Sequence, residues 1–208
     1  MPLMCTPWRH LRPTTATLPG LRSATVPRVA AAARWSALAA VFALFIGCSP
    51  TLDWRELRPT GSGIVLLLPC KPVPQVRPVR LDGQVVSLTM NACKAGGQTW
   101  ALAHADVSDP TRLAPTLAEL LVGVGNKLGA PSIGTGNTAV RSLAVKGATP
   151  HAGSQRQTLS GRLPDGTAVQ AEVGVFVVGT TVLQATVLGP SLPADGVAMF
   201  FDSLRTAP

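Results

Sequence analysis

An imidazole and a carboxylate stand two positions apart in the middle of the chain. His104 and Asp106 lie in a segment, 98–106, that alternates in the manner of a β-strand. Side chains two apart on a strand point to the same face, so the carboxylate could orient the imidazole as a general base. The pair lacks the support of a Gly-x-Ser-x-Gly, P-loop, His-Glu-x-x-His or dinucleotide glycine motif. A half-exposed strand histidine is the simpler interpretation, and we predict no catalytic residue.

Thiols offer a second kind of chemistry. The first of the four cysteines lies in the N-terminal leader and Cys48 has a separate role, which leaves Cys70 and Cys93 as a pair. In an oxidising compartment such a pair is expected to form a disulfide. The alternative is a metal site that adds His104 and His151, but this spacing matches no zinc signature. We therefore predict a Cys70–Cys93 disulfide, no metal and no cofactor.

Cys48 follows a short apolar segment. The run 35–47 has thirteen residues without charge and begins directly after Arg34. A membrane-spanning helix needs about 20 apolar residues, so this run is typical of an export signal rather than of a permanent span. Its end, Phe45-Ile46-Gly47-Cys48, resembles the bacterial lipobox, in which the thiol is diacylated and the chain is cut before it.

The lipobox resemblance implies that Cys48 is the lipidation site and that a membrane is a partner through its acyl chains. Two or three acyl chains anchor a protein stably where one does not. Phe45 departs from the usual Leu of this motif. Ser49 stands where Asp is usual in lipoproteins kept at the inner membrane, which favours the outer membrane, facing the periplasm. The alternative is an uncleaved single-pass anchor with Cys48 near the interface.

The basic charge of the chain belongs mostly to its leader. Five of the eighteen Lys and Arg residues, and none of the ten Asp and Glu residues, lie in 1–47, which leaves thirteen against ten in 48–208. Those thirteen are scattered rather than grouped. The chain has no tyrosine and few other aromatic residues that could stack on bases. We expect no nucleic-acid partner.

Composition divides the chain into three parts. Residues 1–47 are expected to be a signal peptide with an unusually long basic leader, and 48–63 a lipidated N-terminus and flexible tether. Trp54, inside the tether, is expected either to anchor at the lipid interface or to contact the folded part, and the contact is favoured. Residues 64–208 are expected to form one domain, long enough to bury roughly two-thirds of its unfolded surface.

Alternating patterns bounded by Gly, Pro and Asp predict a series of strands. The expected strands are 64–68, 75–81, 85–91, 98–106, 138–146, 154–163, 167–178 and 181–188. In 98–106 the alanines at 101, 103 and 105 share a face on which a helix can pack closely. Alternation in 167–178 places Glu172 on an exposed face.

Two helices are expected among these strands. Asp109 and Pro110 begin the first, whose leucines recur at helical spacing until Gly129 stops it. The second begins at Pro193 and Ala194. Its apolar face consists of Val197, Phe200, Phe201 and Leu204. The order of elements predicts an α+β fold, an antiparallel sheet with two helices packed against it.

Several segments together resemble the PsbP-like fold. They are the run Leu-Leu-Pro-Cys-Lys-Pro at 67–72, the central helix, the hairpin around Gly179 and the closing Met-Phe-Phe-Asp-Ser-Leu at 199–204. The chain is more similar still to uncharacterised lipoproteins of Gram-negative bacteria with this layout. The resemblance implies an accessory or assembly factor rather than an enzyme, and it carries over no functional residue.

We therefore expect a lipid-anchored periplasmic protein that binds or assists another protein of the cell envelope. Two alternatives remain open at this point. One is a carrier of a small apolar ligand held between sheet and helix. The other is a small envelope enzyme that uses His104 and Asp106.

Overall fold

The computed structural model describes residues 52–130 and 140–208. Its strands are β1 Arg55–Leu57, β2 Ile64–Leu68, β3 Val73–Leu81, β4 Gln84–Ala95, β5 Gln98–Asp106, β6 Val140–Ser142, β7 Gln155–Arg162, β8 Ala168–Val178, β9 Thr181–Gly189 and β10 Arg205–Thr206. Its helices are a 3₁₀ turn, Pro110–Arg112, and the α-helices α2 Leu113–Lys127 and α3 Ala194–Asp202.

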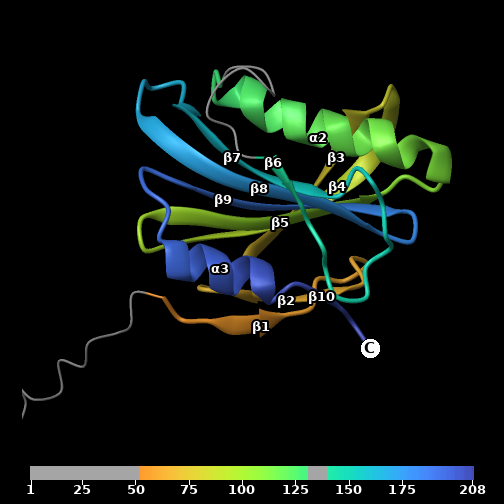
Figure 1. Cartoon of the computed structure of the whole chain (residues 1–208), viewed down its shortest axis with the longest axis horizontal. Coiled ribbons are helices and arrows are strands. Elements are labelled where there is room, and N and C mark those ends of the chain that lie inside the picture. The colour runs from red at the N-terminus through yellow and green to blue at the C-terminus, as the bar shows by residue number, and fades with distance from the viewer. Residues whose placement is uncertain (1–51, 131–139) are drawn as a thin grey trace, which may run out of the picture. The chain divides into compact units, whose positions relative to one another are not determined.

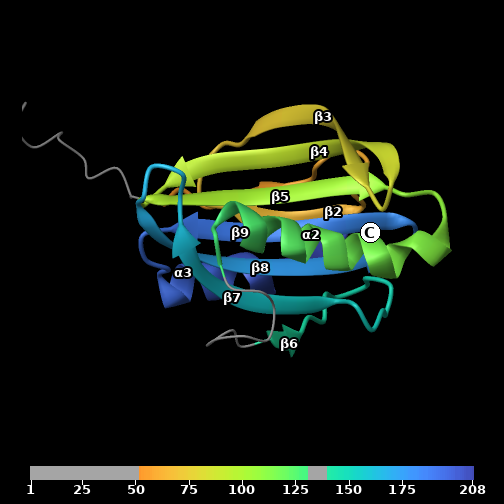
Figure 2. The same ribbon diagram turned by 90° about the horizontal axis from the view of Figure 1, so that it is seen from above.

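The described strands form two antiparallel sheets. The large sheet has seven strands in the order β3-β4-β5-β9-β8-β7-β6, and the small sheet has the order β1-β2-β10. Helix α2 covers one face of the large sheet, while α3 and the small sheet cover the other (Figure 1). Seen from above, α2 crosses the middle of the large sheet (Figure 2). The predicted antiparallel α+β architecture is confirmed, but the second sheet was not expected.

Two-residue turns fix the register of the large sheet. Asp82 and Gly83, both with positive φ (47° and 74°), close the β3–β4 hairpin. Positive φ at both positions matches the twist of the paired strands and so favours a tight hairpin here. Gly96 and Gly97 close β4–β5 in the same way, with φ of 61° and 83°. Both turns lie at the Gly- and Asp-containing boundaries between the expected strands 75–81, 85–91 and 98–106, and these boundaries are confirmed.

The limits of α2 follow from its terminal residues. Asp109 accepts a hydrogen bond from the Thr111 amide at 2.9 Å, at the start of the 3₁₀ turn that leads into the helix. At the other end Gly129 has φ of 56°, and the Ala130 amide donates to the Gly125 carbonyl at 3.0 Å. This is a Schellman arrangement, which satisfies carbonyls that the helix leaves open. The predicted stop is confirmed, whereas the predicted start at Asp109 and Pro110 is a 3₁₀ turn and α2 itself begins at Leu113.

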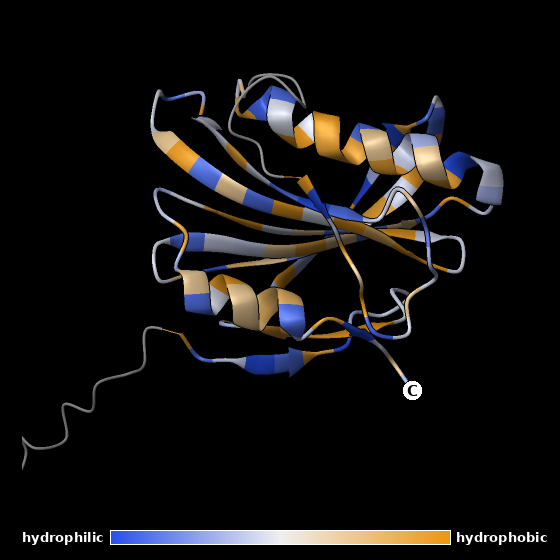
Figure 3. Ribbon diagram, viewed as in Figure 1, coloured by the Kyte–Doolittle hydropathy of each residue, from blue (hydrophilic) through white to orange (hydrophobic). Residues whose placement is uncertain are grey.

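Buried apolar residues form two cores, one on each face of the large sheet. The first packs α2 on β8 and its neighbours and includes Ala105 from the predicted alanine face. The second packs α3 and β2 on the opposite face, around Trp100 and Phe200. The apolar face predicted for α3 belongs to this second core. Figure 3 shows apolar residues along the central strands between the two helices, whereas β1 is hydrophilic.

The folded part begins earlier than the sequence indicated. The expected tether extends to Gly63, but Arg55–Leu57 pairs with β2 as strand β1. The ring of Trp54 lies edge-on to that of Trp100, with centroids 5.6 Å apart, as expected for contact with the domain. The strand was missed because its three residues carry no apolar alternation, and pairing with a distant segment stabilises it.

Several expected features lie outside the described residues. These are the signal segment, Cys48, Ser49, the first part of the expected tether, and the start of the expected strand 138–146. Of the expected strand 138–146, residues 140–146 are described, and the strand there ends at Ser142. Among the described residues, no helix is both long and apolar enough to cross a membrane.

Candidate functional site

Glu172 lies near the middle of β8 and is only 4% exposed. The prediction that alternation would leave it exposed is wrong. Alternation separates the two faces of a strand, but it does not reveal whether both faces are covered. Here α3 covers the second face of the large sheet, so almost all of β8 is buried.

Both oxygens of the buried carboxylate have donors. Arg156 Nε and Arg141 Nη2 each lie 2.5 Å from Oε1, and Thr158 Oγ1 donates to Oε2 at 2.5 Å. Thr158 stands directly opposite Glu172 in the β7–β8 ladder, and Arg141 reaches in from β6. A charge taken out of water needs such partners, because an unpaired buried carboxylate would cost several kcal/mol. Three neighbouring strands thus meet at one carboxylate.

The surroundings keep Glu172 ionised at neutral pH. Burial by itself would raise the pKa of its carboxyl group. The hydrogen bonds from Thr158 and Arg156, and the positive charge of Arg156, outweigh burial, and the pKa lies below its ordinary value. Glu172 is therefore a fixed acceptor that orients two arginines, rather than a proton donor.

Arg156 is held from two directions. Its guanidinium carbon lies 3.7 Å from the centre of the Phe201 ring, while its Nε is bonded to Glu172. Gly174, opposite Arg156 in the ladder, leaves room for that ring, since a Cβ there would come within 2.7 Å of Phe201 Cε1. The side chain of Arg156 is only 14% exposed, so its position is defined by packing and charge together.

An open cleft of about 450 Å³ runs between α3 and strands β6 to β8. Its strand side presents the charged cluster, and its helix side is mostly small or apolar. The lining residues are Arg141, Arg156, Thr158, Gln170, Glu172, Leu192, Ala194, Val197, Ala198 and Asp202. The cleft therefore combines a preorganised charged floor with an apolar wall, which is typical of a binding site.

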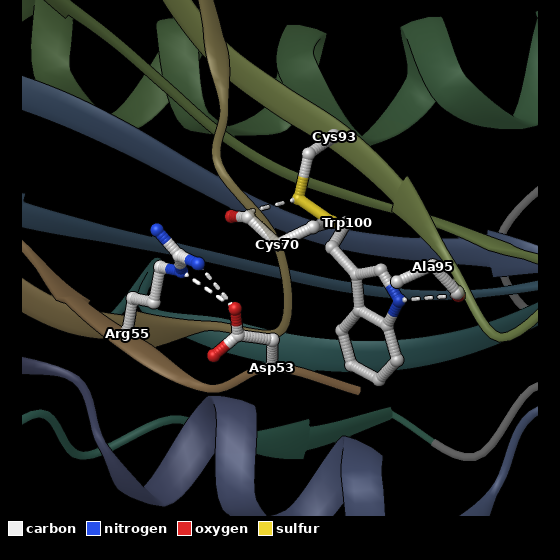
Figure 4. The surroundings of a disulfide bond; sticks show 6 residues. All are labelled: Asp53, Arg55, Cys70, Cys93, Ala95 and Trp100. Carbon is white, nitrogen blue, oxygen red and sulfur yellow. Dashed lines mark hydrogen bonds and ion pairs between the residues drawn. A yellow bond between two sulfur atoms is a disulfide. The ribbon is translucent and has the colours of Figure 1, made fainter. Parts of the chain in front are cut away.

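The predicted disulfide is confirmed. Cys70 and Cys93 are bonded, with Cα atoms 5.9 Å apart, and they join the segment after β2 to β4 (Figure 4). The bond links the small sheet to the large one beside Trp100, whose Nε1 donates to the Ala95 carbonyl at 3.1 Å. Because both sulfurs are in this bond, the metal site that shares them with His104 and His151 loses two of its four ligands.

His104 and Asp106 lie on the same face of β5, but their surroundings and hydrogen-bond partners differ. His104 is 6% exposed, lies under the turn at Gly61, and its Nε2 has no hydrogen-bond partner. Burial lowers its pKa. Asp106 is exposed and accepts from the Ser108 amide at 2.9 Å and from Thr180. The expected half-exposed histidine is in fact buried, because the 59–63 turn covers β5.

The charged cluster was missed because its members are scattered in sequence. Arg141, Arg156 and Glu172 come from three strands, and only the register of the sheet brings them together. One signal was present in the sequence. A single carboxylate stands inside the otherwise apolar and small run 171–178, where an unpartnered charge would be costly.

Comparisons with known proteins add no assignment to these observations. No protein-family model matches the chain, and no curated protein is similar enough to count as a match.

Proposed function

We propose that this chain is a lipid-anchored protein of the bacterial cell envelope, held to the membrane through Cys48 and similar to lipoproteins with a PsbP-like domain. The observation that carries the proposal is the Cys70–Cys93 disulfide. Structural disulfides form and persist in oxidising compartments such as the periplasm, so the bond supports an exported protein. The Phe45–Cys48 motif supplies the anchor, and Ser49 favours the outer membrane.

The proposed role is non-enzymatic binding to, or assembly of, another envelope component. The open cleft beside α3 supports a binding role, since it exposes fixed charges next to an apolar wall. Catalysis by His104 and Asp106 has little geometric support, because each has a different environment. An apolar ligand enclosed under α2 or α3 would have to displace the core side chains that pack there, so the carrier alternative is left only the open cleft beside α3.

The anchor is tested with Cys48→Ala in the full chain, followed by fractionation of the producing cells. Wild-type protein should be found in the membrane fraction and should incorporate labelled palmitate. The variant should accumulate unprocessed or leave the membrane, and it should incorporate no label. Cys5→Ala is the matched control, because it removes a leader cysteine and should change neither result. Normal processing and membrane retention of Cys48→Ala would defeat the proposed anchor.

The binding role is tested by crosslinking the wild-type protein in intact cells and identifying what is recovered with it. A specific envelope protein, recovered reproducibly and lost with Cys48→Ala, is the expected result. Recovery of the bait alone under several growth conditions would argue against an assembly role.

A further inference from the structure

The cleft beside α3 has its charges at one end and its neutral, mostly apolar surface at the other. Phe201 and Asp202 close α3 near Arg156, which stacks on Phe201. At the opposite end, Gln170 pairs with Gly189 on β9, close to Leu192 and the start of α3. A ligand that fills the cleft would therefore contact charged side chains at one end and small or apolar side chains at the other.

Of the two arginines that line the cleft, Arg156 offers the donors with the better-defined position, because its side chain is 14% exposed whereas that of Arg141 is 57% exposed. The Nε of Arg156 is bonded to Glu172, but its two Nη groups donate to no described residue, and neither is a buried atom without a partner. They are therefore accessible, and Arg156 is one of the residues that line the open cleft. Glu172 takes no part in binding a further cation, because both of its oxygens already accept hydrogen bonds. A fixed guanidinium with a free planar edge matches the two oxygens of a carboxylate.

The charges that line the cleft disfavour a ligand with more than one negative charge. Two arginines and two carboxylates line the cleft, so its side chains sum to zero. With these side chains at a net charge of zero, a bound phosphate dianion would leave the cleft more negative than a bound carboxylate would, so the singly charged ligand meets less repulsion from Asp202. Ala194 and Ala198 are exposed on the wall and leave room for a narrow alkyl chain beside α3.

We propose that this cleft binds a small monocarboxylate with a short alkyl chain, its carboxylate on the Nη edge of Arg156 and its chain along α3. Arg141, Thr158 and Glu172 act as positioning residues that hold the guanidinium in place. This site does not depend on the anchor, because the residues that define it lie between Arg141 and Asp202. Failure of the Cys48→Ala test would not count against this binding site, and failure to bind hexanoate would not count against the anchor.

The test is a titration of the full chain, in a non-ionic detergent, with hexanoate, and with hexanamide as the uncharged probe of the same shape. Amide NMR signals of Thr158 and Ala194 report on the two ends of the cleft. Hexanoate should shift both sets of signals in a saturable manner. Hexanamide should bind about tenfold more weakly or not at all, because it lacks the charge-assisted hydrogen bonds.

Matched variants separate binding from structural effects. Ala198→Glu adds a negative charge to an exposed wall position and should weaken hexanoate binding about tenfold relative to Ala198→Gln, which has nearly the same size. Asp202→Asn should strengthen binding severalfold, which a purely structural role would not produce. Arg156→Gln should abolish it, while Arg77→Gln, an equal change of charge on β3, should not.

Equal shifts by hexanoate and hexanamide would overturn the proposal. So would equal affinities of the two folded Ala198 variants. Because Ala198 is exposed, this comparison remains decisive even where Arg156→Gln fails to fold.

Discussion

Two buried titratable residues of this protein are stabilised in opposite ways. Glu172 is ionised, because its two carboxylate oxygens accept hydrogen bonds from Arg156, Arg141 and Thr158. His104 has no such partners, and burial alone lowers its pKa from the ordinary value near 6.5. The imidazole is therefore neutral in the folded protein at neutral pH. The difference between the two residues is that neighbouring strands supply donors to Glu172 and none to His104 Nε2.

The neutral His104 predicts a loss of stability on mild acidification. Above pH 6.5 the imidazole is neutral in both states and contributes nothing to pH dependence. As pH falls below that value, the unfolded chain binds a proton that the folded chain does not, so unfolding is favoured. The loss is complete once pH falls through the lower folded-state pKa. It amounts to about 1.4 kcal/mol for each pH unit that separates the two pKa values.

Urea denaturation at pH 7.5 and 5.5 measures this effect in wild type and in His104→Leu. The free energy of unfolding of the wild type should fall more between the two pH values than that of the variant. His151, whose Nδ1 accepts from the Gly153 amide, is present in both proteins and cancels in the comparison. An identical pH dependence of the two proteins would show that His104 does not carry the effect.

At the scale of elements, the locally encoded features could be predicted from sequence. The Asp82–Gly83 hairpin and the C-terminal end of α2 follow from a few adjacent residues, and they are confirmed. Strands β1 and β10 could not be found in this way, since each is short and pairs with β2. In the case of β10, the partner is about 140 residues away. The cleft could not be predicted from the sequence for the same reason, because only the pairing of β6, β7 and β8 brings its arginines close to Glu172.

The free edge of β3 is protected by two prolines. Pro74 and Pro78 occupy ladder positions opposite Asn91 and Ser87. At these positions a backbone N–H would point toward the open edge, and proline has no N–H to place there. Val76 lies between them and is 65% exposed. An edge with alternate donors removed is a poor template for a further strand, so the prolines oppose edge-to-edge association.

Replacing both prolines should expose the edge. The double variant Pro74→Ala, Pro78→Ala restores two outward donors beside Val76, so it should self-associate at concentrations where the wild type stays monodisperse. Sedimentation velocity over a tenfold range of concentration measures this. Pro164→Ala is the control, because it removes a proline from the exposed β7–β8 turn and leaves the edge unchanged. If the double variant sediments like the control, edge protection by these prolines is refuted.

At the largest scale, the described part of the chain is a stack of layers whose order could not be predicted from the sequence. Apolar faces on α2 and α3 were predicted, but nothing in either pattern says that the helices take opposite sides of one sheet. That arrangement follows from connectivity, because β2 and α3 together cover the face that α2 leaves open. The Ser203 hydroxyl helps to hold them together, accepting from the Leu67 amide at 2.8 Å and donating to the Phe200 carbonyl at 2.7 Å.

The Cys70–Cys93 bond is a second link between these layers, and its removal predicts a global effect. It closes a loop with a sequence separation of 23 residues, for which the chain-entropy account gives about 3 kcal/mol. The double variant Cys70→Ala, Cys93→Ala should lose about that much unfolding free energy. Its melting temperature should then fall by about 10 °C, since 1 kcal/mol corresponds to roughly 2–4 °C for a domain of this size.

Reductant supplies the matched control, because it should destabilise the wild type by the same amount and leave the double variant unchanged. A wild type that melts identically with and without reductant would contradict the predicted contribution. Hexanoate binding should survive in the folded double variant. The cleft is held by the Arg156–Glu172 ion pair and by the stacking of Arg156 on Phe201, and neither contact involves β4, which carries Cys93. A parallel loss of stability and binding would instead mean that the bond between the sheets also fixes the position of α3 over Arg156.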